Sequence, residues 1–162
     1  MNLSSQTPLM RMSIANSKSN KLLIAAAACV FIAALLHLGC IIFGGDWYRF
    51  LGAGEQMAIM AEQGHWYPTA VTAMISIILL MMLIFALSGA GVIYRLPLLR
   101  LGLVLISAVF IFRGLCFPLI FSAFPENSMS FWIISSGICL VIGLLFAGGT
   151  WQVWPNLKPA PK

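Results

Sequence analysis

Long apolar runs alternate with short polar segments along this chain of 162 residues. Each apolar run has enough residues to cross a hydrocarbon core of ~30 Å, because a helix rises about 1.5 Å per residue. Short connections between such runs favour neighbouring helices that run in opposite directions. We therefore predict an all-α fold, an integral membrane bundle of four antiparallel transmembrane helices. The expected spans cover residues 21–43, 69–94, 98–123 and 129–153.

The polar segments outside these runs predict two tails and one lid. Residues 1–20 and 155–162 are polar, and we expect them to be cytoplasmic tails that precede and follow a transmembrane domain over residues 21–154. Residues 44–68 form a long polar segment between the first two runs, and Asp46 is a residue type that starts helices. We expect a short interfacial helix in this external lid, between the first and second spans.

The composition favours a membrane location. Charged residues make up 8% of the chain and hydrophobic residues 61%, whereas a soluble domain is about 25% charged. Water would not solvate such a surface, so the excess apolar area is expected to face lipid. The net charge of +5 does not indicate nucleic acid, because the basic residues are scattered and form no stripe with aromatic residues.

The basic residues in the short flanks of the runs predict the orientation. Seven of them lie on the side of the two termini: Arg11, Lys18, Lys21, Arg95, Arg100, Lys158 and Lys162. The opposite side has Arg49, and Arg113 lies within a span. By the positive-inside rule, we expect both termini in the cytoplasm and the lid outside. The first apolar run exceeds the apolar region of a signal peptide, so we expect an uncleaved helix.

Three stretches of this sequence carry a resemblance: GAGEQMAIMAEQGHWYP, LSGAGVIYRLPLLRLGL and FRGL. With them, most of residues 30–152 resembles a family of small, uncharacterised four-span inner-membrane proteins of proteobacteria. The resemblance implies the four-span architecture and a location in the bacterial inner membrane. It implies no activity, ligand or partner.

Arg113 is the most informative polar residue, because a charge within a span costs ~2.5–3.5 kcal/mol on insertion scales and usually faces a partner. At ~1.5 Å per residue, Arg113 lies about 15 Å from the outer edge of the third span and His37 about 10 Å deep in the first. Glu55 of the lid is the preferred counter-charge, and Glu62 is the alternative. Ser135 offers a hydroxyl at comparable depth in the fourth span. These five residues form the candidate ligand-binding set, either as a structural clamp or as an outward-opening pocket for a small molecule or lipid headgroup.

Catalytic and metal-binding motifs are missing from this sequence. The cysteines are single, with no CxxC pair. His37 and Cys40 share a helix face, but two ligands do not make a metal site. No nucleophile elbow, phosphate loop or zinc-protease motif occurs, so we assign no catalytic residue, no metal ligand and no cofactor. Cys40 and Cys116 both lie toward the outer side, which leaves a disulfide between them open.

The sequence favours a multi-pass membrane protein that acts as a structural module or binds a partner or a small ligand. The expected partners are the lipid bilayer, a lipid or small hydrophobic ligand, a second copy of the chain or another membrane protein, and no nucleic acid. Two alternatives stay open: a small transporter or channel subunit that works as an oligomer, and a membrane enzyme that modifies a lipid or isoprenoid. No sequence feature requires the enzyme.

Overall fold

The computed structural model describes residues 19–120 and 127–157. Within these ranges every regular element is a helix, as the apolar runs predict. In chain order the elements are α2 (Lys21–Phe43), α3 (Gly45–Phe50), α4 (Glu55–Glu62), α5 (Trp66–Gly89), α6 (Leu99–Leu115), α7 (Phe117–Ile120), α8 (Met129–Val153) and the 3-10 helix η3 (Trp154–Leu157). Most of the two expected tails, with Arg11, Lys18, Lys158 and Lys162, lies outside the described residues.

Three helices of the described chain are long and apolar enough to cross a membrane: Lys21–Phe43, Trp66–Gly89 and Met129–Leu157, which joins α8 and η3. They are compatible with a multi-pass membrane protein. The fourth long helix, α6, has 17 residues and is about 25 Å long at ~1.5 Å per residue, which is shorter than a ~30 Å hydrocarbon core. A fourth span therefore stays a prediction.

The third apolar run is broken in the structure. The sequence predicts one span over residues 98–123, whereas α6 ends at Leu115 and α7 begins at Phe117. Pro118 explains the break, because proline has no N–H to donate and its ring clashes with the carbonyl four residues earlier. Residues 121–123 of the expected span lie outside the described ranges.

The second apolar run forms a helix that is shifted toward the lid. The sequence predicts residues 69–94, whereas α5 covers Trp66–Gly89. In the last turn of α5, Ser88 Oγ donates to the Tyr94 carbonyl and accepts from the Leu96 N–H. These two hydrogen bonds hold the connection to α6 as a turn, so the helix stops before Tyr94.

Polar side chains cap the starts of three long helices. Asn20, His65 and Ser128 each accept a hydrogen bond from a backbone N–H in the first turn of α2, α5 and α8, as N-cap residues do. Asn20 also donates its amide to Gln152 Oε1 at 2.8 Å and its backbone N–H to the Ala90 carbonyl at 3.1 Å. Asn20 thereby ties the start of α2 to the ends of α5 and α8.

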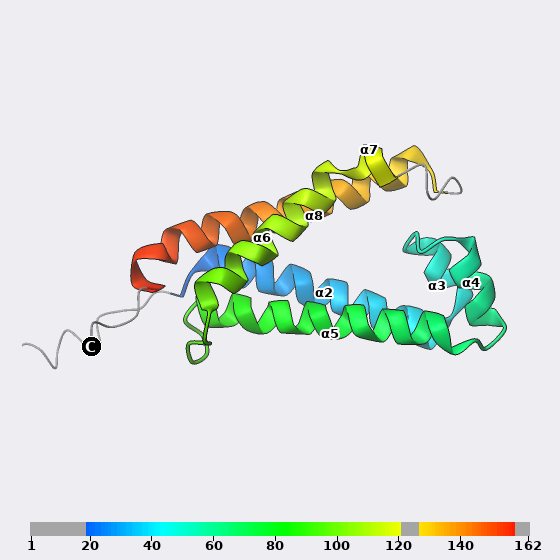
Figure 1. The fold of residues 1–162 in the computed structure, drawn as a ribbon, viewed down its shortest axis with the longest axis horizontal. Helices are drawn as coiled ribbons and strands as arrows, with labels where there is room; N and C mark the ends of the chain where they lie inside the picture. Colours follow the sequence, from blue (N-terminus) through cyan, green and yellow to red (C-terminus); the bar gives the residue numbers. More distant parts are fainter. Residues whose placement is uncertain (1–18, 121–126, 158–162) are drawn as a thin grey trace, which may run out of the picture.

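The long helices pack as two pairs, α2 with α5 and α6 with α8, and the pairs meet through α2 and α8 (Figure 1). Leu23 of α2, Leu103 of α6 and Phe146 of α8 are fully buried in one apolar cluster. Small residues let the backbones approach: a Cβ built on Gly149 of α8 would lie 2.6 Å from Leu23 Cγ, and one on Gly89 of α5 would lie 2.9 Å from Leu23 Cδ1. The bundle is therefore closely packed where α2 begins and α8 ends.

The lid contains two short helices, α3 and α4, instead of the single helix that the sequence predicts (Figure 1). Gly52 and Gly54 between them have φ angles of 70° and 94°, in a region that favours glycine, and α4 folds back onto α3. Tyr48 and Ala58 are buried inside the lid. The Tyr48 hydroxyl accepts a hydrogen bond from Thr72 Oγ1 of α5 at 3.1 Å, which anchors the lid to the bundle.

Candidate functional site

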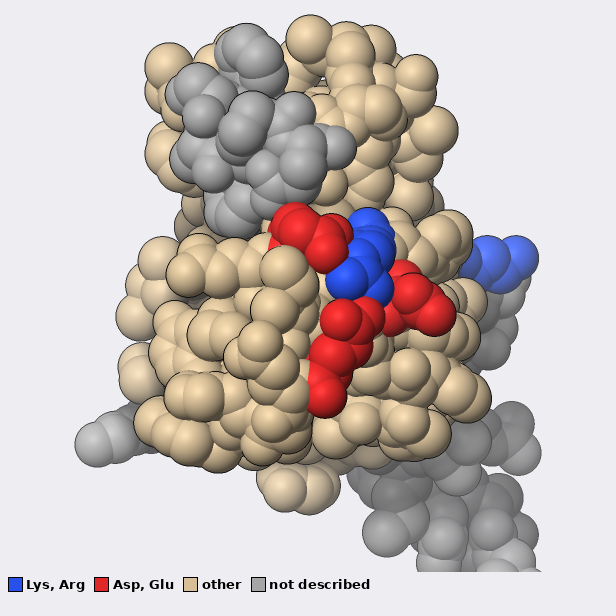
Figure 2. All heavy atoms as spheres, turned by 90° about the vertical axis from the view of Figure 1, so that its right-hand side faces the viewer, with Lys and Arg blue, Asp and Glu red and all other residues tan. Residues whose placement is uncertain are grey.

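Arg49 lies at the centre of an ion-pair cluster on the surface of the lid, where Figure 2 shows a basic side chain among acidic ones. Its Nη2 donates to Glu55 Oε1 at 2.7 Å and its Nη1 to Glu62 Oε1 at 2.5 Å. Nη1 also lies 3.3 Å from Asp46 Oδ1. We call Arg49, Asp46, Glu55 and Glu62 the Arg49 cluster. With three carboxylates around one guanidinium, the cluster carries an excess of negative charge.

Hydrogen bonds within the Arg49 cluster shift the pKa of both kinds of group. The bonds that Arg49 donates to Glu55, and then those to Glu62, raise the pKa of Arg49 above its ordinary value. The same bonds from Arg49 lower the pKa of the Glu55 carboxyl below its ordinary value. The glutamate side chains are 50% and 49% exposed, so water screens each pair and weakens it. The cluster acts as a set of surface links between α3 and α4.

The Arg49 cluster differs from the pairing that the sequence predicts. The sequence favours Glu55 or Glu62 as the counter-charge of Arg113, whereas the structure places both glutamates on Arg49. The reason is proximity along the chain, because the tight turn between α3 and α4 brings these groups together at a small entropic cost of loop closure. Arg113 belongs to α6, which packs in the other helix pair.

Arg113 has polar but uncharged neighbours. Its Nη1 donates to Ser136 Oγ at 3.5 Å, and its Cζ lies 5.3 Å from the centroid of the Trp132 ring. A guanidinium at that distance from an indole ring gains a cation–π attraction. Within residues 19–120 and 127–157, no carboxylate forms an ion pair with it. Both neighbours belong to α8, so Arg113 links α6 to α8.

His37 and Ser135 make hydrogen bonds within their own helices. His37 Nδ1 lies 2.8 Å from the Ala33 carbonyl oxygen, and Ser135 Oγ donates to the Trp132 carbonyl at 3.3 Å. Among the residues that the structure describes, no hydrogen bond or ion pair joins His37, Ser135 and Arg113 to one another. The structure therefore brings together the two glutamates of the candidate set and does not connect the other three residues.

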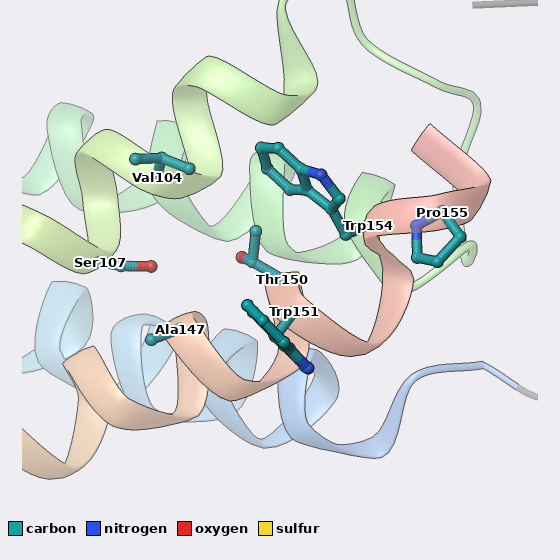
Figure 3. Close-up of a pocket in the computed structure, with 7 residues that line it drawn as sticks. All are labelled: Val104, Ser107, Ala147, Thr150, Trp151, Trp154 and Pro155. Carbon is teal, nitrogen blue, oxygen red and sulfur yellow. The ribbon is translucent and has the colours of Figure 1, made fainter. Parts of the chain in front are cut away.

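A groove that the sequence did not predict lies between α6, α8 and η3 (Figure 3). We call it the α6–α8 groove, and its cavity volume is about 520 Å³. It is lined by Val104 and Ser107 of α6, by Ala147, Thr150 and Trp151 of α8, and by Trp154 of η3. The sequence signal for this site was a threonine beside two tryptophans at the end of an apolar run, which reads equally well as an interfacial anchor.

A second groove lies between α2 and α8, and we call it the α2–α8 groove. Its cavity volume is about 550 Å³. Nine residues of the two helices line it: Cys29, Ile32, Ala33 and Leu36 of α2, and Ile134, Gly137, Ile138, Val141 and Ile142 of α8. Within the described chain this lining contains neither a hydroxyl nor a charged side chain. The two grooves thus have similar size and different chemistry.

The described residues contain no group of three or more His, Cys, Asp and Glu side chains that could hold a metal ion. Cys40 and Cys116 are free thiols, so the structure does not contain the disulfide that the sequence left open.

No protein-family model, curated protein or solved structure matches the chain. The resemblance to four-span inner-membrane proteins, and the bacterial location that it implies, therefore stay predictions. The function rests on the geometry of the molecule.

Proposed function

We propose that the protein is a four-span protein of the bacterial inner membrane that binds a lipid and catalyses no reaction. In this proposal α6 is the fourth span, the four long helices are antiparallel, both termini face the cytoplasm and the lid faces outward. The three candidate spans support a multi-pass protein. The excess of Lys and Arg on the side of the termini supports the orientation.

Exposed apolar side chains along α6 support its place in the membrane. They occur from its first turn to its last: Leu101, Val104, Leu105, Val109, Phe112 and Leu115. A helix in water does not present so large a continuous apolar face without a partner. A bilayer thins locally around a short span at modest cost, which accommodates the 17 residues of α6.

The α6–α8 groove is the observation that carries the lipid-binding function. Its volume of about 520 Å³ lies within the ~300–1,000 Å³ range of small-ligand sites. Its walls are mostly apolar, which suits an acyl chain. Trp151 at its edge is 83% exposed, and tryptophan favours the membrane interface. A lipid in the surrounding bilayer therefore meets a surface that matches it.

The charged groups of the described chain support binding over acid–base chemistry. Its three carboxylates all belong to the Arg49 cluster, and the lowered pKa of Glu55 makes this carboxylate a weak general base near neutral pH. In the described ranges Arg113 has no carboxylate with which to move a proton. The transporter and enzyme alternatives both depend on a connected polar set, which these contacts do not supply.

Native mass spectrometry of the protein, extracted from its host membrane in a mild detergent, tests the proposed function. We expect the chain to carry a phospholipid that survives washing, because the groove shields part of the acyl chain. A chain that emerges free of lipid, and takes up none from mixed micelles, contradicts lipid binding.

A further inference from the structure

The Thr150 hydroxyl differs from other buried hydroxyls of the long helices. Ser76 and Ser107 each donate to the carbonyl four residues earlier, at 2.9 and 2.7 Å, which is a common arrangement for a hydroxyl in an apolar helix. Thr150 is 5% exposed, yet its Oγ1 has no hydrogen-bond partner among the described residues. Leaving a buried hydroxyl without a partner costs stability, and more so at membrane depth. Because Thr150 lines the α6–α8 groove, a ligand there can supply the partner.

Thr150 and Ser107 point toward one another across the α6–α8 groove, one from α8 and one from α6 (Figure 3). Among the described residues no hydrogen bond joins them, and the Ser107 hydroxyl donates to the Leu103 carbonyl. Ser107 can therefore accept, while the proton of Thr150 is available to donate. A ligand that accepts a hydrogen bond from the Thr150 hydroxyl must place an acceptor oxygen beside it in the α6–α8 groove. Because Trp151 and Trp154 also line the groove, the rest of the ligand is expected to be apolar.

Arg100 places a positive charge at one end of the groove. Its Nη2 donates to the Trp154 carbonyl at 2.8 Å, and its Cζ lies 4.7 Å from the centroid of the Trp154 ring, which lines the groove. Its Nε has no hydrogen-bond partner within the described ranges. Arg100 precedes Ser107 by two turns of α6, which is about 10 Å at ~1.5 Å per residue. The site thus has the Thr150 hydroxyl inside the groove and the Arg100 guanidinium nearer the end of the bundle.

We propose that the α6–α8 groove binds an anionic glycerophospholipid, with an acyl chain on the apolar wall, an ester carbonyl accepting from Thr150 and the phosphate facing Arg100. This inference rests on the proposed function and names the lipid class. The ester oxygens and the phosphate of such a lipid follow one another in the same order as Thr150 and Arg100. A free fatty acid has one acceptor group and a sterol has no anionic group, so neither can both accept from Thr150 and pair with Arg100.

Thr150→Val tests the hydrogen bond, because valine has nearly the same shape and no hydroxyl. Native mass spectrometry of the full chain in detergent measures binding of added phosphatidylglycerol and of phosphatidylcholine with the same acyl chains. We expect the wild type to prefer phosphatidylglycerol and Thr150→Val to bind it roughly tenfold more weakly, the effect of one good hydrogen bond. Ser76→Ala is the matched control, since it removes a hydroxyl that already has a partner, and it should bind like the wild type. Wild-type binding by Thr150→Val overturns the inference.

Arg100→Gln tests the headgroup. We expect the preference for phosphatidylglycerol over phosphatidylcholine to fall to about equal binding, because glutamine keeps polar groups and loses the charge. Binding of phosphatidylcholine should weaken less than that of phosphatidylglycerol, because its phosphate also faces Arg100 but its cationic choline group is repelled by the same charge. A preference that persists in Arg100→Gln contradicts the assigned position of the phosphate.

Ala147→Phe fills the α6–α8 groove, and Ala33→Phe fills the α2–α8 groove as its control. We expect lipid binding to be lost in the first variant and kept in the second. Loss in Ala33→Phe alone overturns this inference and leaves the proposed function intact, because a lipid then binds in the other groove. A wild-type chain that binds neither phospholipid contradicts both.

Discussion

At the lid, Arg49 is surrounded by three carboxylates, whereas at the opposite end of the bundle Arg100 lies against the Trp154 ring and donates to a backbone carbonyl. The two arginines carry the same charge, yet the lid presents net negative charge to an approaching anion and the α8–η3 end presents a positive one. The comparison shows that the groups around an arginine decide what it can bind. The two ends also differ in what stabilises them: ion pairs link the helices of the lid, whereas close packing holds the α8–η3 end.

The largest expected effect breaks the close packing at the α8–η3 end. Gly149→Ala places a Cβ 2.6 Å from Leu23 Cγ, and overpacking of this kind costs about 1–3 kcal/mol. Gly137→Ala is the matched control on the same helix, because a Cβ there meets nothing within 4 Å. Thermal unfolding in detergent should show a lower midpoint for the first variant, and an unchanged or slightly higher one for the second, since alanine favours helix. Equal midpoints for both would show that α8 does not approach α2 so closely.

A smaller effect separates the environments of Arg49 and Arg113. Arg49→Met leaves three neighbouring carboxylates without a counter-charge, so we expect lower stability. Arg113→Met loses a cation–π contact worth about 0.5–2 kcal/mol but avoids an insertion cost of ~2.5–3.5 kcal/mol, so we expect unchanged or higher stability. Thermal unfolding of the two variants side by side measures the contrast. A marked loss in Arg113→Met would mean that this guanidinium is paired with a carboxylate in the folded protein.

The smallest expected effect is a dependence on pH that belongs to the lid. Because the pKa of Glu55 is lowered in the folded protein, its contribution is present above the ordinary value of about 4.3 and is lost as the pH falls through the lowered value. The difference in unfolding midpoint between wild type and Glu55→Gln should therefore be largest near neutral pH and shrink below about pH 4. Asp46→Asn is the control, because the Asp46 side chain is 95% exposed and should change little. A constant difference across this range contradicts the ion pair.

Much of the helical fold could be predicted, because apolar length and capping residues are local properties of the chain. α2 begins after Asn20 and α8 after Ser128, each of which caps its helix. The split of the lid at Gly52 and Gly54 was missed, since their positive φ angles are a choice that glycine permits and does not require.

The candidate site was harder to predict, because it depends on contacts between segments. Depth counting placed Arg113 well inside a span, whereas Arg113 lies in the last turn of α6 because the helix ends at Leu115. Counting also could not show that the α3–α4 turn brings Glu55 to Arg49. The α6–α8 groove was missed for the same reason. Thr150 can be recognised as a candidate binding residue only in the structure, where the packing of α6 on α8 leaves its hydroxyl without a partner among the described residues.

Photocrosslinking in native membranes tests the central claim most directly, because no detergent intervenes. A benzophenone amino acid is introduced at Trp151, beside the α6–α8 groove, and separately at Leu144, which is 62% exposed on the same helix. Mass spectrometry of the adducts then compares their headgroups with those of the bulk membrane. We predict that anionic glycerophospholipids are enriched at position 151 and match the bulk at position 144. The same headgroup mixture at both positions would contradict a selective lipid site at this end of the bundle.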